Sequence, residues 1–207
     1  MLDDRIVVHG RARRSVAPDV ATVRMVVMEL DQEQRAAFER CGPRLNELTA
    51  RLRALIGGDG QVTVGALRVE PYWEEPAEHE RGRNVQAASG PVAVECMPAL
   101  AARVISEAIA LGVDEVHGPR YSVRDPSPVL EELLGAAVVA ARRKAERLAQ
   151  AAERSLGGIV AVEERFRGGW EDDGVSVAGA AAEPAEVDLR PAELTLAATV
   201  RVTFALG

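Results

Sequence analysis

Three histidines are the residues of this sequence best suited to acid–base or metal chemistry. His79 lies in the acidic run at residues 74–80, which resembles a divalent-metal loop but lacks the helical His–Glu spacing of zinc proteases. We interpret this run as an exposed hairpin tip. His9 and His117 lie on predicted strands and could meet in space. No third ligand or carboxylate accompanies them, so ordinary polar or core histidines are the preferred interpretation.

Nucleophilic and glycine-rich motifs also have structural explanations. Ser89 lacks the flanking glycines of a hydrolase nucleophile, and residues 57–60 follow a predicted helix, whereas a phosphate-binding loop precedes one. Cys41 and Cys96 fall in a predicted helix and a predicted strand, without the paired spacing of a metal or redox motif, so we expect buried free thiols. The sequence therefore assigns no catalytic, cofactor-binding or metal-binding residue.

Two tryptophans border acidic segments. We expect Trp73 and Trp170 to anchor the loops beside them, with contact to a partner as the alternative. Residues 168–191 mix glycine, alanine, proline and acids without periodicity, which predicts a mobile acidic loop that orders only in contact with another protein.

The spacing of apolar residues predicts the elements that position these side chains. Asp31 followed by Gln34 resembles a capping box, and Pro43 predicts either a kink in the following helix or a helix that starts there. Gly90 and Pro91 predict an interrupted strand at a sheet edge. Alternation predicts strands over residues 6–12, 21–27, 62–69, 85–96, 113–123, 159–166 and 194–206, and helical spacing predicts helices over 34–57, 100–111 and 126–157.

The order of these elements predicts an α+β protein. The first two strands form an opening hairpin, and a strand pair followed by a helix occurs twice. We therefore expect two similar halves that share a mixed, largely antiparallel sheet packed by helices. No long polar linker precedes residue 168, so residues 1–207 are predicted to form one cooperative domain.

Composition excludes several functional classes. A net charge of −7 with only 3% aromatic residues argues against nucleic-acid binding, which depends on cationic side chains and stacking rings. Charged residues interrupt every long apolar tract, so no membrane span is predicted. The first residues lead directly into a predicted strand and do not form an export signal, which predicts a cytoplasmic protein.

Three stretches together resemble the SIMPL family, whose bacterial members include YggE-like proteins. They are residues 8–12 with 16–23, residues 118–125 with the helix that follows, and residues 191–194 leading into the last strand. The resemblance implies an α+β fold, self-association into a homo-oligomer and a link to stress or envelope physiology. It implies no catalytic residue and no cofactor. The lack of an export signal departs from the usual bacterial pattern.

Three functional hypotheses follow. The leading one is a non-enzymatic, self-associating binding or scaffold protein with long strands available for edge pairing. The alternative is a metal-dependent or small-molecule enzyme that uses His9 or His117 in a cleft between the halves. The third is an adaptor whose loop at residues 168–191 orders on a protein partner.

Overall fold

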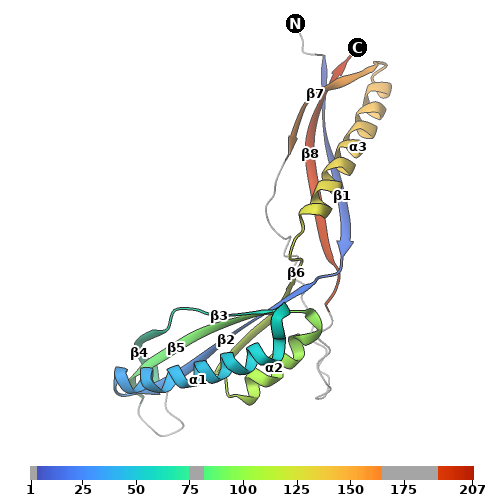
Figure 1. Ribbon diagram of the computed structural model, residues 1–207. Coiled ribbons are helices and arrows are strands. Elements are labelled where there is room, and N and C mark those ends of the chain that lie inside the picture. Colours follow the sequence, from blue (N-terminus) through green and yellow to red (C-terminus); the bar gives the residue numbers. More distant parts are fainter. Residues whose placement is uncertain (1–3, 75–81, 165–190) are drawn as a thin grey trace, which may run out of the picture. The chain divides into compact units, whose positions relative to one another are not determined.

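The computed structural model describes residues 4–74, 82–164 and 191–207 (Figure 1). The chain forms two compact units. The ends of the chain build unit 1, and the central part from Pro18 to Val123 builds unit 2. The α+β class is confirmed, and every strand pair is antiparallel. The elements are β1 (Arg5–Val16), β2 (Val20–Asp31), α1 (Gln34–Ile56), β3 (Gln61–Val64), β4 (Arg68–Glu74), β5 (Arg83–Cys96), α2 (Ala101–Ala110), β6 (Glu115–Ser122), α3 (Ser127–Ala151), β7 (Leu156–Glu164) and β8 (Leu194–Leu206).

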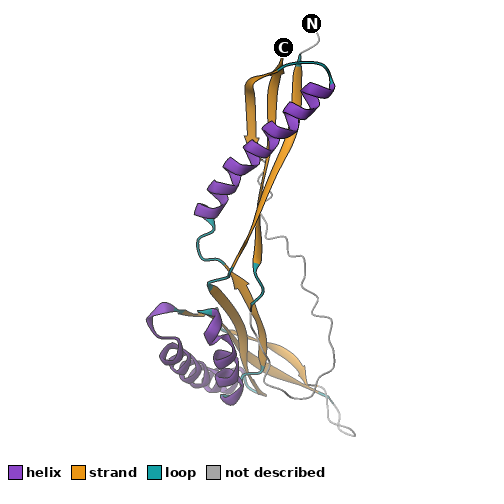
Figure 2. Ribbon diagram, turned by 90° about the vertical axis from the view of Figure 1, so that its right-hand side faces the viewer, coloured by secondary structure: helices purple, strands orange, loops and turns teal. Residues whose placement is uncertain are grey.

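Unit 1 is a three-stranded sheet in the order β1-β8-β7, with α3 along one face (Figure 2). The central strand β8 confirms its predicted alternation, because every second residue from 196 to 204 is buried. Phe204, Val202 and Val200 pack with Val8 of β1 against alanines of α3. Those alanines, Ala137, Ala141 and Ala145, are fully buried, and their short side chains let the helix lie close to the sheet.

The closest approach of helix and sheet in unit 1 occurs at Gly10. A Cβ atom at this position would lie 1.9 Å from the carbonyl oxygen of Ala137, far inside van der Waals contact. Only glycine has no Cβ, so the contact between β1 and α3 requires it.

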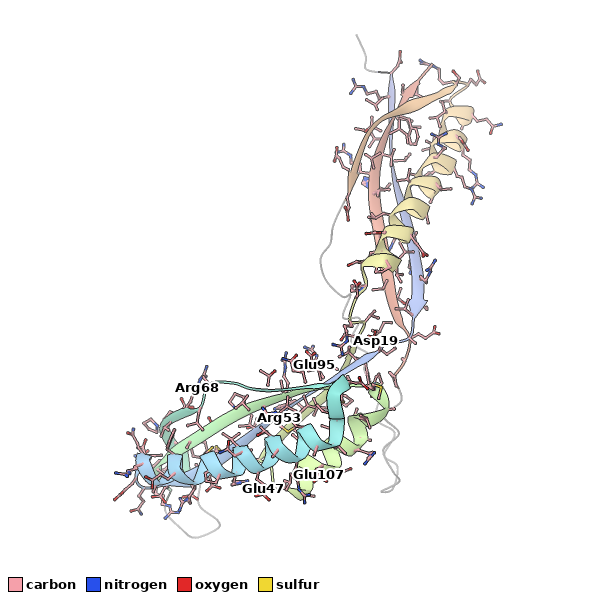
Figure 3. The ribbon with its side chains drawn as sticks, viewed as in Figure 1. Asp19, Glu47, Arg53, Arg68, Glu95 and Glu107 are labelled. Atoms are coloured by element: carbon pink, nitrogen blue, oxygen red, sulfur yellow. The ribbon has the colours of Figure 1, made fainter. Side chains whose placement is uncertain are left out.

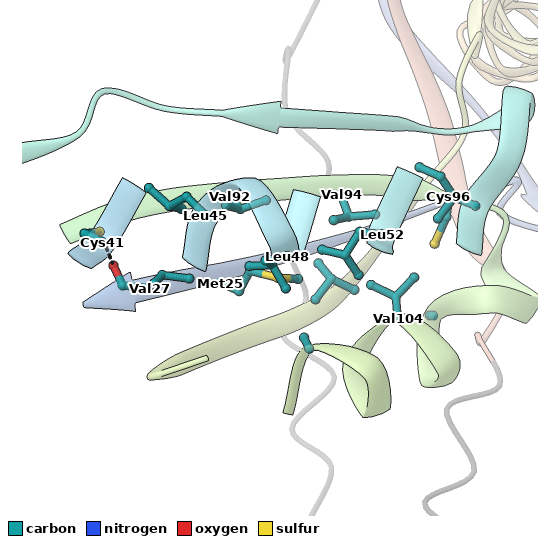
Figure 4. Close-up of a cluster of buried hydrophobic side chains, with 14 of the residues drawn as sticks. Met25, Val27, Cys41, Leu45, Leu48, Leu52, Val92, Val94, Cys96 and Val104 are labelled. Atoms are coloured by element: carbon teal, nitrogen blue, oxygen red, sulfur yellow. Dashed lines mark hydrogen bonds between the residues drawn. The ribbon is translucent and has the colours of Figure 1, made fainter. Parts of the chain in front are cut away.

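Unit 2 is built on a sheet in the order β3-β5-β2-β6, with β4 beside β5. The apolar faces of α1 and α2 pack on it, and Figure 4 shows Leu48, Leu52 and Val104 meeting strand residues such as Met25. Charged side chains occupy the outer face of α1, among them Glu47 and Arg53 (Figure 3). The amphipathic pattern predicted for α1 is therefore confirmed.

The opening hairpin predicted from sequence is wrong. β1 pairs with β8 along its whole length, whereas β2 pairs with β5 and β6. The described strands thus form two sheets and not the single shared sheet that was expected. Alternation and a turn signal cannot distinguish a hairpin from two strands that enter different sheets, because the partners come from distant parts of the chain. Whether the two units unfold as one cooperative domain stays a prediction.

Pro91 was expected at a sheet edge, and this expectation is wrong. β5 has β2 on one side and β3 and β4 on the other. The carbonyl of Pro91 accepts the N–H of Gly65 at 2.8 Å. In an antiparallel strand the nitrogen of a residue points to the same side as its carbonyl, so the nitrogen of Pro91, which has no hydrogen to donate, faces the gap between β3 and β4. The proline is tolerated because its neighbouring strand is interrupted there.

Two helix ends differ from the predictions. α1 starts at Gln34 and continues through Pro43, so it does not start at the proline. Asp31 accepts the N–H of Glu33 at 3.0 Å, which closes the turn before the helix without forming a capping box. α3 ends at Ala151 and not near residue 157, because the chain turns at Glu153, whose φ of 53° lies in the left-handed region.

We predict that Gly10→Ala lowers the free energy of unfolding by about 2–4 kcal/mol, because the new Cβ overlaps the α3 backbone. Gly135→Ala on α3 is the matched control, since a Cβ there meets nothing within 4 Å. That control should gain roughly 0.5–1 kcal/mol from helix propensity. Urea denaturation followed by circular dichroism measures both, and equal stabilities of the two variants would contradict the close contact.

Candidate functional site

The structure places His9 and His117 on the surface. His9 is exposed on β1 of unit 1, and His117 is exposed on β6 of unit 2 with its Nε2 3.2 Å from the Glu115 carboxylate. His79 and the rest of the acidic run beyond Glu74 lie outside the described residues. The hypothesis of an enzyme that uses His9 or His117 stays a prediction.

No metal centre can be built from the described residues, where no group of three or more histidine, cysteine or acidic side chains could hold an ion. One shallow hollow lies on α3 and is lined by Ala140, Arg143, Lys144, Arg147 and Leu148. None of the candidate residues from the sequence lines it. Its chemistry is cationic and apolar, which suits a negatively charged surface.

Cys41 and Cys96 are buried free thiols, as predicted, and both lie in the core of unit 2 (Figure 4). Burial is the main cause that raises the pKa of each thiol above 9.0, and for Cys41 the nearby Glu29 carboxylate raises it further. The Sγ atom of Cys41 lies 3.8 Å from the carbonyl oxygen of Val27. A buried, protonated thiol is a poor nucleophile, so these cysteines act as core residues.

The remaining motifs occupy structural positions. Ser89 lies within β5 opposite Met28, and residues 57–59 form a 3-10 turn after α1. Trp73 is 55% exposed, yet a Cβ atom added to Gly82 would lie 2.3 Å from its ring. The indole therefore covers the backbone at Gly82, just before β5, which fits the anchoring role. Trp170 and residues 168–190 lie outside the described residues.

Sequence reasoning missed a polar cluster centred on Arg44. Its guanidinium donates to the carbonyls of Met28 and Gly112 and to the Glu29 carboxylate, and it lies 3.6 Å from Asp114. The Asp114 carboxylate accepts the N–H of Met28 at 2.6 Å. Because Arg44 bonds to groups on β2 and in the loop after α2, the cluster fastens these segments together and is structural.

A signal for this cluster exists in the sequence. Arg40 and Arg44 are four residues apart on α1, each beside a core position, and acids end the preceding strand. Arg40 forms an ion pair with Asp31. The N–H of Glu33 is the main group that lowers the pKa of the Asp31 carboxyl, and Arg40 lowers it further. Spacing alone, however, does not identify the partners of the two arginines.

Among the described strands, the most exposed apolar one is β7 in unit 1. All its residues after Leu156 are exposed, including Ile159 at 40%, Val160 at 50% and Val162 at 50%. Val162 lies opposite Val202, which is fully buried beneath α3. Paired residues share a face of a sheet, so the apolar face continues onto β7 without the helix cover that β8 has.

The outer edge of β7 offers backbone groups for pairing. At the end of β8, the N–H of Leu206 bonds to β1 through Asp4, and the N–H of Gly207 bonds to Ser155 before β7. The backbone groups of successive residues alternate in direction, so those of Val202, like those of Leu206, point toward β1 and away from β7. Val162, which lies opposite Val202, therefore forms no backbone hydrogen bond with it, and its N–H and carbonyl point away from the sheet. Among the described strands, β7 pairs with β8 alone.

The fold and these surfaces define an α+β protein of two antiparallel-sheet units, whose most distinctive exposed features are an edge strand and a helix face. In the part of the chain that the structure describes, no helix is long and apolar enough to cross a membrane.

The model of the SIMPL family, described as "Protein of unknown function (DUF541)", matches residues 6–204. The chain therefore belongs to the SIMPL family, which confirms the resemblance seen in the sequence. It is 23% identical over 168 residues to the "26 kDa periplasmic immunogenic protein" of Brucella melitensis biotype 1, a match that covers 79% of this chain and 67% of the relative. The protein of the same name from Brucella abortus (strain S19) matches with the same identity and coverage.

We predict that stability falls more steeply above pH 9 in the native protein than in a Cys41→Ala/Cys96→Ala variant. The pKa of each thiol is higher in the folded protein than in the unfolded chain. The stability that each thiol contributes is therefore complete below its pKa in the unfolded chain, and it is lost as the pH rises through its pKa in the folded protein. Urea denaturation between pH 7 and pH 10.5 measures both slopes. Equal slopes, or rapid labelling of the native thiols at pH 7, would contradict the burial of the two cysteines.

Proposed function

We propose that this SIMPL protein is a non-enzymatic binding or scaffold protein that self-associates by pairing the β7 edges of two copies. The observation that carries the proposal is the apolar, exposed strand β7, whose outward backbone groups have no partner among the described strands. A second copy of β7 supplies matching donors and acceptors, as in other forms of strand addition.

The two edges of the unit 1 sheet differ in a way that favours β7. β1 carries Arg5, Arg11 and Arg13, and charged side chains on an edge strand oppose its pairing with another chain. β7 has no charged residue from Leu156 to Val162. Its two terminal glutamates, residues 163 and 164, leave most of the strand free to pair.

Burial provides the driving force. Ile159 lies opposite Phe204, and Val162 lies opposite Val202, so both extend the apolar face that α3 covers farther along the sheet. Antiparallel addition of a second β7 places equivalent valines near one another across a two-fold axis. Removing this apolar surface from water stabilises the pair by roughly 25 cal/mol per Å² before the cost of association.

The physiological setting of the proposal follows from the family. The resemblance implies a stress-related role, and the two relatives are periplasmic by name. The cytoplasmic location expected for this chain stays a prediction. Cell fractionation with antibody detection tests that location directly, and recovery in the periplasmic fraction would overturn it.

We predict that Val162→Pro weakens self-association at least tenfold. The proline removes an outward donor that a second β7 needs, but no hydrogen bond to β8. The matched control is Val7→Pro on the opposite edge, because Val7 is 46% exposed and its amide also points away from β8. Light scattering and sedimentation equilibrium measure the mass of each variant.

The result expected is a native oligomer, retained in Val7→Pro and lost in Val162→Pro at the same concentration. Circular dichroism checks that both variants keep their secondary structure. A native chain that remains monomeric at high concentration, or a Val162→Pro variant that associates as the native chain does, would overturn the proposal.

A further inference from the structure

The outward face of α3 is apolar at its centre and oppositely charged toward its two ends. We define the outer stripe as the six residues that helical geometry places on this face: Glu132, Ala136, Val139, Ala140, Arg143 and Arg147. All are exposed except Ala140, which is half-buried. The opposite face of α3, which contains Ala137 and Ala141, packs on the sheet.

Val139 is the central apolar residue of the outer stripe. Its side chain is 60% exposed, on a helix whose other face already supplies the core of unit 1. Beside it is the shallow hollow lined by Ala140, Arg143, Lys144, Arg147 and Leu148. An exposed branched side chain next to a hollow that a small residue helps to line is a shape that a second helix can match.

The cations of the hollow have no counterion among the residues that the structure describes. Arg143, Lys144 and Arg147 form no ion pair in the part of the chain that the structure describes. Arg143 and Arg147 are four residues apart on α3, a spacing at which like charges repel. An acidic group brought to this end of the stripe would relieve that repulsion.

The acidic groups that match lie on the same helix. Glu131 and Glu132 are exposed on the N-terminal half of α3. The Oε2 atom of Glu132 lies 2.7 Å from Arg14 in a surface ion pair, so its other oxygen can accept a further hydrogen bond. The stripe therefore carries negative charge before Val139 and positive charge after it.

We propose that a second copy of this chain docks its α3 antiparallel on the outer stripe, around a two-fold axis between residues 139 and 140. In this arrangement Val139 faces Ala140 of the partner subunit, and Glu132 faces Arg147 of the partner subunit. Ala136 faces Arg143 of the partner subunit, whose aliphatic stem covers the small side chain. The two-fold symmetry makes each of these pairs twice.

Other occupants match the stripe less well. Two parallel helices in register would place the cations against cations and the glutamates against glutamates. An anionic lipid surface would attract the arginines but repel Glu131, Glu132 and Glu146, all exposed on the same helix. Only an antiparallel copy satisfies both ends and buries Val139.

This contact uses residues distinct from β7, so it does not rest on the edge pairing proposed above. It spans about four helical turns, which is smaller than a standard stable interface of about 1,600 Å². We therefore expect a weak contact by itself, with a dissociation constant in the micromolar range or above.

Site-specific cross-linking tests the axis. Ala140→Cys places a thiol next to its own symmetry mate, and we expect a disulfide dimer under mild oxidation. Gln150→Cys is the control on the same helix, because its symmetry mate lies about 30 Å away in the proposed arrangement. The native cysteines are buried and do not interfere. A dimer from Gln150→Cys but not from Ala140→Cys would overturn the antiparallel arrangement.

Charge reversal tests the pairing of the ends. On sedimentation equilibrium of the full chain, we expect Arg147→Glu or Glu132→Arg alone to weaken the α3 contact about tenfold. The combination of both changes should restore it to within about threefold, because the reversed charges are complementary again. Failure of the combination to restore association, with folding unchanged by circular dichroism, would overturn the proposal.

The outcomes also separate this contact from the β7 edge. If Ala140→Cys still forms a cross-linked dimer when Val162→Pro is added, the α3 contact is supported. The β7 proposal is decided separately, by the masses of the Val162→Pro and Val7→Pro variants. Co-sedimentation of the native chain with phosphatidylglycerol vesicles, abolished by Arg147→Glu and without any Ala140→Cys dimer, would assign the stripe to a lipid surface instead.

Discussion

The antiparallel pairing of β1 with β8 is the interaction on which unit 1 depends. It runs without interruption from Arg5 to Val16 and makes β8 the central strand, so that β7 and α3 both depend on it. The alternation in β8 provides one apolar face, and the alanines of α3 allow the helix to lie close to that face. The closest approach is at Gly10, where the backbone of β1 contacts the backbone of α3 and leaves no space for a Cβ atom. Apart from Phe204, the buried residues of this interface are aliphatic, so it gains its stability from many close contacts between small side chains.

The sequence predicts the elements of this fold better than their partners. Apolar spacing is a local property, so the strand at residues 194–206 and the helix that stops just before Gly57 are recovered from it. Strand pairing is a property of the whole chain, and the turn at Pro18 gives the same signal whether the strands around it form a hairpin or enter two sheets. Pro91 shows the same limit, because its position is explained only by the interruption of a strand more than twenty residues earlier.

The candidate surfaces were predictable to a smaller degree. Alternation identifies β7 as a strand, but the exposure of Ile159 and Val162 follows from the position of α3 over the other strands. Helical spacing likewise cannot show that Val139 faces outward until the buried alanines are located. His9, His117 and the two cysteines drew attention because of their chemistry, yet the two histidines are surface residues and the cysteines are core residues. In the described part of this SIMPL protein the distinctive features are an exposed edge strand and an exposed helix face.

The interleaved order of the two units has a consequence for synthesis on the ribosome. Unit 2 is nearly continuous in the chain, from Pro18 to Val123, so its strands and helices can assemble as soon as they leave the exit tunnel. β1 is translated first but must wait for β8, whose 13 residues come almost last. During that interval the nascent chain exposes β1 without its partner strand. Charged residues on an unpaired strand oppose its aggregation, so we expect the arginines of β1 to keep the nascent chain soluble until β8 has been synthesised.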